Sequence, residues 1–434
     1  MKDKQEDTGM RKEKSFIVLI LVTCLVLSLT ACGNKSATKD LTKDRNKDTI
    51  YCFTDEIVIG DDEYDEAKVV SALTEFSLRL FEENLKDQGE ANVLISPTSV
   101  ITAFGMTTFG AKGNTLAQMQ EVFGVKRGEL TKLSGKYMNN DSKVLKLANS
   151  VWFTNDDRLT VKDEFLQFNE EFYSADIYEA AFNAATCESI NKWVEKKTDG
   201  MIKDILDEIP ADAVMYLINA LAFESEWAEQ YKESDIWKDA KFTTSEGIVQ
   251  KVDLMCSEEA LYLVDEEAKG FIKQYKDRNY AFVALLPNEG VSVEDYVKNL
   301  SADHLQNMLS NPYKGAVVKA YLPQFSHEYN VEMSDLLKGM GMTDAFDGKK
   351  ADFTDMAISS EGNIFINRVI HKTFIEVSPV GTKAGAATVV EMMNESAIMY
   401  DEVHEVRLDR PFLYMIIDCE NNMPLFIGTV NSVE

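Results

Sequence analysis

Residues 378–398 read SPVGTKAGAATVVEMMNESAI, a stretch near the C-terminus that has features of both a loop and a strand. They lie between two strand-like runs, VIHKTFIEV at 369–377 and VRLDRPFLYMII at 406–417. Within 381–393, the even positions carry no charge, whereas Lys383 and Glu391 both fall on odd positions. Successive side chains of a strand point to opposite faces. The stretch therefore combines the small residues of a loop with the alternation of a half-buried strand.

The composition indicates a large globular protein with an acidic surface. The chain has 434 residues, of which 45% are hydrophobic, enough for a sizeable core. Its 45 Lys and Arg residues are outnumbered by 73 Asp and Glu residues, which gives a net charge of −28. Because phosphate groups are bound through clustered basic side chains, we expect no nucleic acid as a partner and no general binding to anionic membranes.

The N-terminus has the pattern of a targeting segment. Basic residues precede an apolar run at 16–29, which closes in Leu29-Thr30-Ala31-Cys32. Small residues before such a cysteine resemble the bacterial lipobox, in which the cysteine is lipidated and becomes the new N-terminus. We predict a lipoprotein signal peptide over 1–31, lipidation of Cys32 and a location on the extracellular face of the membrane, with later release left open. An ordinary signal peptide or a membrane anchor is the alternative.

The rest of the chain reads as a tether followed by one domain. Residues 32–65 are polar and are predicted to be a flexible tether, whereas 66–434 has a globular pattern. Helices are predicted at 68–84, from Ser96-Pro97 to Gly110, at 188–206 and at 333–340. Strands are predicted at 145–153, 215–223, 279–287, 315–325, 367–377, 411–418 and 423–430. The order of helices and strands favours the α+β class.

The sequence carries no catalytic or metal-binding signature. It has no GxSxG elbow, no HExxH and no GxxxxGK[ST] loop, and its four histidines are scattered. Cys52, Cys187, Cys256 and Cys419 form no CxxC pair, and we expect isolated thiols, with one disulfide left open. We therefore expect no enzyme activity, no cofactor and no metal.

Seven segments, in order, resemble the serpin family. They are NVLISPTS at 92–99, GAKGNTLAQ at 110–118, LANSVWF at 147–153, INKWVEKKTDGMIKDI at 190–205, LINALAFESEW at 217–227, GMGMTDAFDGKKADFTDM at 339–356 and VRLDRPFLYMI at 406–416. The resemblance covers about residues 66–434. It implies three β-sheets, eight or nine helices and an exposed reactive-centre loop at about 379–405. A protease that cuts this loop is trapped as an acyl-enzyme when the cut loop inserts as a new strand into the central sheet.

The resemblance also implies two groups of site residues. The hinge, which starts the loop and must enter the sheet, has small uncharged residues that suit burial: Gly381, Thr382, Ala384, Gly385, Ala386, Ala387 and Thr388. A polar cluster beneath the central sheet and a tryptophan at its top mark where the strands part: Ser96, Ser99, Asn219, His371 and Trp227. The alternatives are an ordinary flexible loop and a set of unrelated core residues.

The reactive bond is located by counting from the hinge. In most inhibitors of the family the residue before the bond is the fifteenth from the hinge glycine, which gives Glu395–Ser396. Alternatives at Met392, Met393, Met399 and Tyr400 remain open because this loop looks longer than usual. We therefore expect a monomeric inhibitor of extracellular serine proteases that touches the membrane through its lipid alone. A non-inhibitory binding protein on the same fold is the alternative.

Overall fold

The computed structural model describes residues 38–44, 53, 64–88, 91–138, 144–313, 315–382 and 402–433. Besides the one-turn helix α2 (Leu41–Asp44), the helices in these residues are α4 (Glu66–Gln88), α5 (Pro97–Thr108), α6 (Gly113–Phe123), α7 (Arg127–Met138), α8 (Asp163–Tyr173), α9 (Ala184–Lys197), α10 (Val293–Asn299), α11 (Ala302–Ser310) and α12 (Ser334–Gly339). Short 3-10 turns occur at Glu233–Asp235 and Asp344–Phe346. None of these helices is long and apolar enough to cross a membrane.

Two helix boundaries show how the local sequence sets the structure. Ser96 caps α5 as predicted, because its Oγ accepts the backbone N–H of Ser99 at 3.2 Å. The helix predicted at 188–206 is α9, which ends earlier than predicted, at Lys197. Asp199 and Gly200 take positive φ angles of 47° and 76° there, and a left-handed backbone ends a helix.

The central sheet is formed by two four-stranded parts. One part has the order β1 (Lys39–Asp40), β5 (Asp176–Ala180), β3 (Leu145–Thr154) and β6 (Met215–Phe223). The other has the order β14 (Phe325–Glu332), β16 (Ile370–Val377), β17 (Gly381–Thr382) and β7 (Ser225–Glu226). Since β7 follows β6 directly in the chain, the two parts join at this end of β6 and part along the rest of it. We call this the hinge end, and the opposite end, where β6 begins, the far end.

Two further sheets and a ribbon complete the β-structure. The six-stranded sheet has the order β10 (Tyr262–Val264), β11 (Ala268–Gln274), β12 (Tyr280–Pro287), β19 (Phe412–Asp418), β20 (Pro424–Val430) and β2 (Leu94–Ile95). The four-stranded sheet has the order β18 (Glu402–Arg407), β13 (Ala316–Pro323), β9 (Val249–Glu259) and β8 (Ile236–Thr243), and β15 (Ala357–Ser359) pairs with β4 (Leu159–Val161). Every residue of β12 and β19 is buried, which explains their continuous apolar sequence. The helix count and the three sheets agree with the predicted α+β fold.

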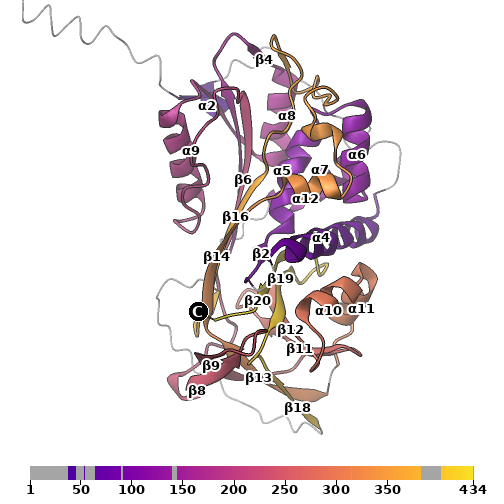
Figure 1. The fold of residues 1–434 in the computed structure, drawn as a ribbon, viewed down its shortest axis with the longest axis vertical. Helices are drawn as coiled ribbons and strands as arrows, with labels where there is room; N and C mark the ends of the chain where they lie inside the picture. The colour runs from indigo at the N-terminus through magenta and orange to yellow at the C-terminus, as the bar shows by residue number, and fades with distance from the viewer. Residues whose placement is uncertain are drawn as a thin grey trace, which may run out of the picture.

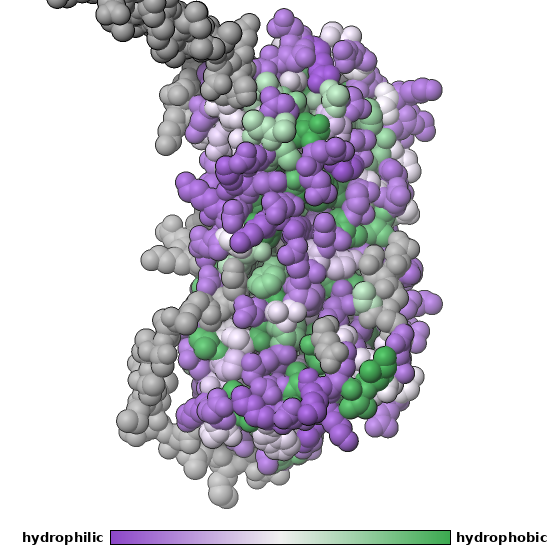
Figure 2. All heavy atoms as spheres, turned by 60° about the vertical axis from the view of Figure 1, so that its left-hand side comes forward, coloured by the Kyte–Doolittle hydropathy of each residue, from purple (hydrophilic) through white to green (hydrophobic). Residues whose placement is uncertain are grey.

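The molecule is elongated, with different structure at its two ends. Figure 1 shows α5, α6, α7 and α8 gathered at one end and the strands β8, β9, β13 and β18 at the other. Hydrophilic side chains cover most of the face in Figure 2, with hydrophobic groups showing between them. This surface agrees with the acidic, highly charged composition of the chain.

Residues 38–44 and Phe53 fall in the stretch predicted as a tether, and they pack on the domain. β1 pairs with β5, and the Oγ1 of Thr42 accepts the N–H of Ile177 at 2.8 Å. Leu41 is buried. The ring of Phe53 makes edge-on contacts with three others, those of Phe109, Phe168 and Phe172. These contacts attach part of the N-terminal segment to the edge of the central sheet through β1, and to α8 and the end of α5 through Phe53.

Candidate functional site

The first two hinge residues, Gly381 and Thr382, form strand β17 between β16 and β7. Thr382 lies opposite Val377 of β16 and opposite Ser225 of β7. The turn before them is closed by Ser378, whose N–H donates to the carbonyl of Gly381 at 3.0 Å. Glycine is required at 381, because a Cβ there would lie 2.1 Å from the carbonyl oxygen of Ser225. The start of the hinge therefore already occupies the central sheet.

The side chain of Thr382 is anchored by a buried aromatic pair. It is 2% exposed, and its Oγ1 lies 2.6 Å from the hydroxyl of Tyr275, whose pKa is raised by burial. The ring of Tyr275 stacks on Trp227, with centroids 4.7 Å apart and planes 9° apart. Trp227 donates its Nε1–H to the carbonyl of Ser378 and its backbone N–H to that of Val380, both at 2.9 Å. Trp227 thus holds the turn from which the hinge begins.

A buried ion pair lies beside this aromatic pair. Lys273 Nζ is 2.8 Å from Glu259 Oε1, and the two side chains are 3% and 13% exposed. The ammonium group also lies 5.5 Å from the ring centroid of Trp227 and 4.5 Å from that of Tyr231. Because Lys273 belongs to β11 and Glu259 to β9, the pair connects the six-stranded sheet to the four-stranded sheet near the hinge end.

The polar residues predicted beneath the central sheet are partly brought together. The N–H of Ser96 donates to Nε2 of His371 at 2.9 Å, and Ser96 also contacts Ser99 through the helix cap. Burial lowers the pKa of His371 to about 4, which agrees with a neutral ring that accepts a hydrogen bond. Asn219 lines the same cavity as these three residues, but its side chain donates instead to Oδ1 of Asn149 at 2.8 Å. Its own Oδ1 has no hydrogen-bond partner in the described part of the chain.

A cavity of about 360 Å³ lies where the central sheet parts. Its walls include 215–219 of β6 and 370–373 of β16, and residues of α5 contribute to its lining. Within the described ranges, β6 has a strand partner only on its β3 side, and β16 only on its β14 side except at β17. Backbone groups along these two edges are available to pair with a further strand. The geometry is therefore that of a sheet with one strand position empty beyond β17.

Several predicted site residues lie outside the described residues, and nothing structural is said of them. They are Cys32, the hinge residues Ala384, Gly385, Ala386, Ala387 and Thr388, and the bond candidates Met392, Met393, Glu395, Ser396, Met399 and Tyr400. Conversely, sequence reasoning missed Tyr275, Lys273 and Glu259. Lys273 is one of two lysines in the strand AKGFIKQ, beside Lys269, so neither it nor Tyr275 gave a separate sign in the sequence.

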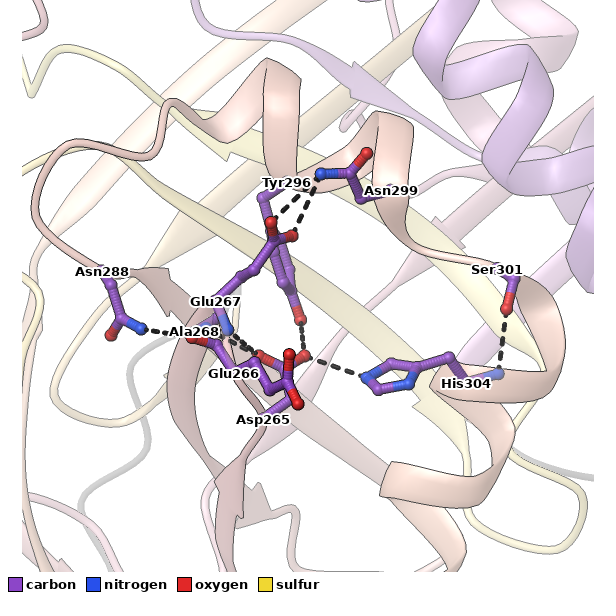
Figure 3. Close-up of polar contacts among 9 residues, drawn as sticks. All are labelled: Asp265, Glu266, Glu267, Ala268, Asn288, Tyr296, Asn299, Ser301 and His304. Atoms are coloured by element: carbon purple, nitrogen blue, oxygen red, sulfur yellow. Dashed lines mark hydrogen bonds and ion pairs between the residues drawn. The ribbon is translucent and has the colours of Figure 1, made fainter.

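A second polar network, shown in Figure 3, lies beside α10 and α11. Oδ2 of Asp265 accepts the hydroxyl of Tyr296 at 3.0 Å and lies 3.0 Å from Nε2 of His304. Burial raises the pKa of Asp265, but two backbone N–H groups and these side chains outweigh it and keep that pKa below its usual value. Ser301 Oγ accepts the backbone N–H of His304 and so caps α11. This network is a helix anchor, and in the described residues no group of three or more His, Cys, Asp or Glu is placed to hold a metal.

Comparisons with known proteins agree with this architecture. A family model described as serpin (serine protease inhibitor) matches residues 71–433. A serpin-like protein of Thermococcus kodakarensis is 30% identical over 374 residues, covering 84% of this chain and 85% of the relative. The thermophilic serpin tengpin in its native state is similar with a TM-score of 0.80 and 40% identity, covering 91% of this chain and 99% of tengpin. Tengpin in its latent state gives a TM-score of 0.75 and 41% identity, with 86% and 100% covered.

Proposed function

The chain belongs to the serpin family, and from this premise we propose that it is a suicide-substrate inhibitor of extracellular serine proteases. The catalytic serine of the protease attacks the carbonyl carbon of the residue before the reactive bond, and the new amino terminus leaves. The acyl-enzyme ester remains on the cut loop. Insertion of that loop between β6 and β16 carries the protease along and distorts it before water hydrolyses the ester. The reactive bond is Glu395–Ser396, with Met392, Met393, Met399 and Tyr400 as alternative positions before the bond.

The single observation that carries this proposal is the hinge seated between β16 and β7. Thr382 directs its side chain into the core, and with a period of two the same face would next take Ala384, Ala386 and Thr388. These side chains are small and uncharged, so their burial beyond β17 costs little. The cavity between β6 and β16 supports the same direction of insertion.

The location proposed for this inhibitor is the outer surface of the cell. Residues 1–31 would be removed and Cys32 acylated, so that the protein is held by its lipid and works as a monomer. This part of the proposal rests on the sequence pattern at 16–32. Its targets would then be proteases outside the cell.

Incubation with a panel of serine proteases tests the inhibitor proposal. Glutamyl-specific, elastase-like, chymotrypsin-like and subtilisin-like enzymes cover the candidate bonds, and denaturing electrophoresis detects a covalent complex. Each protease with its catalytic serine changed to alanine is the matched control, because it cannot form the ester. Mass spectrometry of the released fragment identifies the bond, and a fragment beginning at Ser396 is expected.

Two outcomes would overturn the proposal. Loop cleavage by every protease without any covalent complex would support a non-inhibitory binding protein. Repeated turnover of a substrate without consumption of this chain would instead indicate an enzyme.

A further inference from the structure

The docked N-terminal segment and the hinge lie at opposite ends of the central sheet. Lys39 of β1 pairs with Glu179 of β5, which lies opposite Phe153 of β3, and Phe153 pairs with Met215 at the start of β6. The hinge pairs instead with Ser225, just beyond the other end of β6. The ten steps along the strand from 215 to 225 span about 33 Å at 3.3 Å per residue. Figure 1 likewise shows α2 toward one end of the molecule and β18, which follows the loop, toward the other.

The direction of β1 fixes where the chain before it leaves the domain. β5 is parallel to β3, and β3 ends beside Met215, so β5 runs toward the far end. β1 is antiparallel to β5 and therefore runs away from the far end. Lys39, the first residue of β1, is thus the residue of this strand nearest to the far end of the sheet.

Several independent contacts hold this segment in place. Leu41 is 8% exposed and belongs to the main core, a burial worth about 1.5–3 kcal/mol. Thr42 accepts a backbone hydrogen bond from Ile177 at 2.8 Å. Lys39 forms an ion pair with Glu179 at 3.9 Å, and the ladder of β1 adds backbone pairing. The segment is therefore a fixed point of attachment.

Covalent geometry limits how far a lipid on Cys32 can lie from this point. Lys39 lies seven positions after Cys32, and even a fully extended chain of seven such steps reaches only about 25 Å. If the whole stretch from 32 to 64 were flexible, its r.m.s. reach would be about 30 Å and its direction would be unrestricted. Because β1 is attached to β5, the tether that matters is the one between Cys32 and Lys39, and it starts from a fixed point on the domain.

We infer that the partner of the far end is a lipid surface, so that the bilayer faces the β1 end of the central sheet and the hinge and reactive loop point away from it. This inference rests on the acylation of Cys32 proposed above and is independent of whether the loop traps a protease. In this orientation the reactive loop faces the medium, where a soluble protease can reach it.

Energy transfer on vesicles tests the orientation with the full, acylated chain. A donor is introduced through an unnatural amino acid at Asp157, which is exposed in the loop after β3 at the far end, or at Glu233, which is exposed near the hinge end. The acceptor is a headgroup-labelled lipid in vesicles of neutral phospholipid. Transfer from Asp157 is expected to exceed transfer from Glu233 severalfold.

A matched pair of variants connects the result to the docked segment. Leu41→Asp, which puts a charge into the core, should release β1 and lower the ratio of the two transfers, because the attachment nearest to Cys32 would then be Phe53, 21 residues along the chain. Leu41→Met, which nearly conserves the volume, should leave the ratio as in the wild type. An unchanged thermal unfolding temperature of the domain shows that Leu41→Asp acts locally.

The outcomes separate this inference from the proposals it follows. Equal transfer from the two positions in membrane-bound wild type, or greater transfer from Glu233, overturns the orientation. A chain that carries no acyl group on Cys32 by mass spectrometry and does not bind vesicles overturns the anchor and the orientation together. Failure to trap a protease overturns the inhibitor proposal alone.

Discussion

Replacing Thr382 by Arg tests the seated hinge most directly. The native side chain is 2% exposed, and its hydroxyl lies 2.6 Å from that of Tyr275, which is itself fully buried. A guanidinium group at this position would have to enter the core beside a phenol. The variant therefore should keep its hinge outside the sheet, while the rest of the loop and the reactive bond stay unchanged.

The expected magnitude follows from two costs. The hydroxyl of Tyr275 loses its partner, at about 1–3 kcal/mol, and a buried charge without a counter-ion adds several kcal/mol. If about 4 kcal/mol of this raises the barrier to insertion, insertion slows about 10³-fold. Hydrolysis of the acyl-enzyme depends on the protease and is not slowed. The competition between trapping and hydrolysis should therefore shift to hydrolysis, and the inhibitor should become a substrate.

The assay is the number of chains cleaved per covalent complex formed, measured with a protease that the wild type traps. Thr382→Ser is the matched control, because it keeps the hydroxyl that contacts Tyr275. Wild type and Thr382→Ser should form complexes efficiently, whereas Thr382→Arg should be cleaved with little complex. A complex yield for Thr382→Arg equal to that of wild type would refute the reasoning, since a charge would then pass through the buried position without penalty.

Three further predictions concern stability and the hinge. His371 has a pKa of about 4 when folded and 6.5 ordinarily, so the free energy of unfolding should fall by about 3 kcal/mol from pH 6.5 to pH 4 through this group. Denaturant titrations should show a smaller fall in His371→Gln, and an identical fall would contradict this. Lys273→Met leaves Glu259 buried without its counter-ion and should lower the free energy of unfolding by about 3–5 kcal/mol. The double variant Lys273→Met/Glu259→Leu should regain most of this stability. Equal losses for the single and the double variant in chemical denaturation would contradict the prediction. Gly381→Ala puts a Cβ 2.1 Å from a backbone oxygen and should therefore shift the fluorescence emission of Trp227, which lies beside the hinge. Gly339→Ala is the control, because its Cβ would meet no atom within 4 Å, and it should leave the emission unchanged. An unchanged emission in Gly381→Ala as well would exclude the seated hinge.

The fold was predictable because its elements carry strong local patterns. The strand predicted at 215–223 is β6 with the same bounds, and the Ser96-Pro97 start of α5 is a local capping signal. The helix at 188–206 was misjudged at its C-terminal end, since its apolar periodicity continues past the left-handed residues that end it. Patterns of this kind report on neighbours in the chain.

The site was less predictable because its contacts join distant parts of the chain. Thr382 and Tyr275 are 107 residues apart, and they meet through the pairing of β17 with β7 and the bridge between Trp227 and Tyr275. The same holds for the docked N-terminal segment, where Leu41 is an isolated apolar residue in a polar stretch and Phe53 belongs to a short apolar run at 50–53. The burial of Leu41 and the partial burial of Phe53 depend on a sheet edge and an aromatic cluster that the rest of the chain builds.

The position of β1 has a consequence for the space around a captured enzyme. A strand that fills the cavity from the hinge end grows toward Met215, so anything attached to its tip arrives at the end of the sheet where the N-terminal chain leaves. A protease of about 220 residues has a radius of gyration of about 17 Å and a diameter of roughly 45 Å, wider than the span of about 25 Å that seven residues allow. If the bilayer faces the far end of the sheet as we infer, the bound protease and the membrane would occupy the same space. Formation of the protease complex would then require β1 to dissociate from β5. The domain in the complex would therefore lie farther from the membrane than the free inhibitor does.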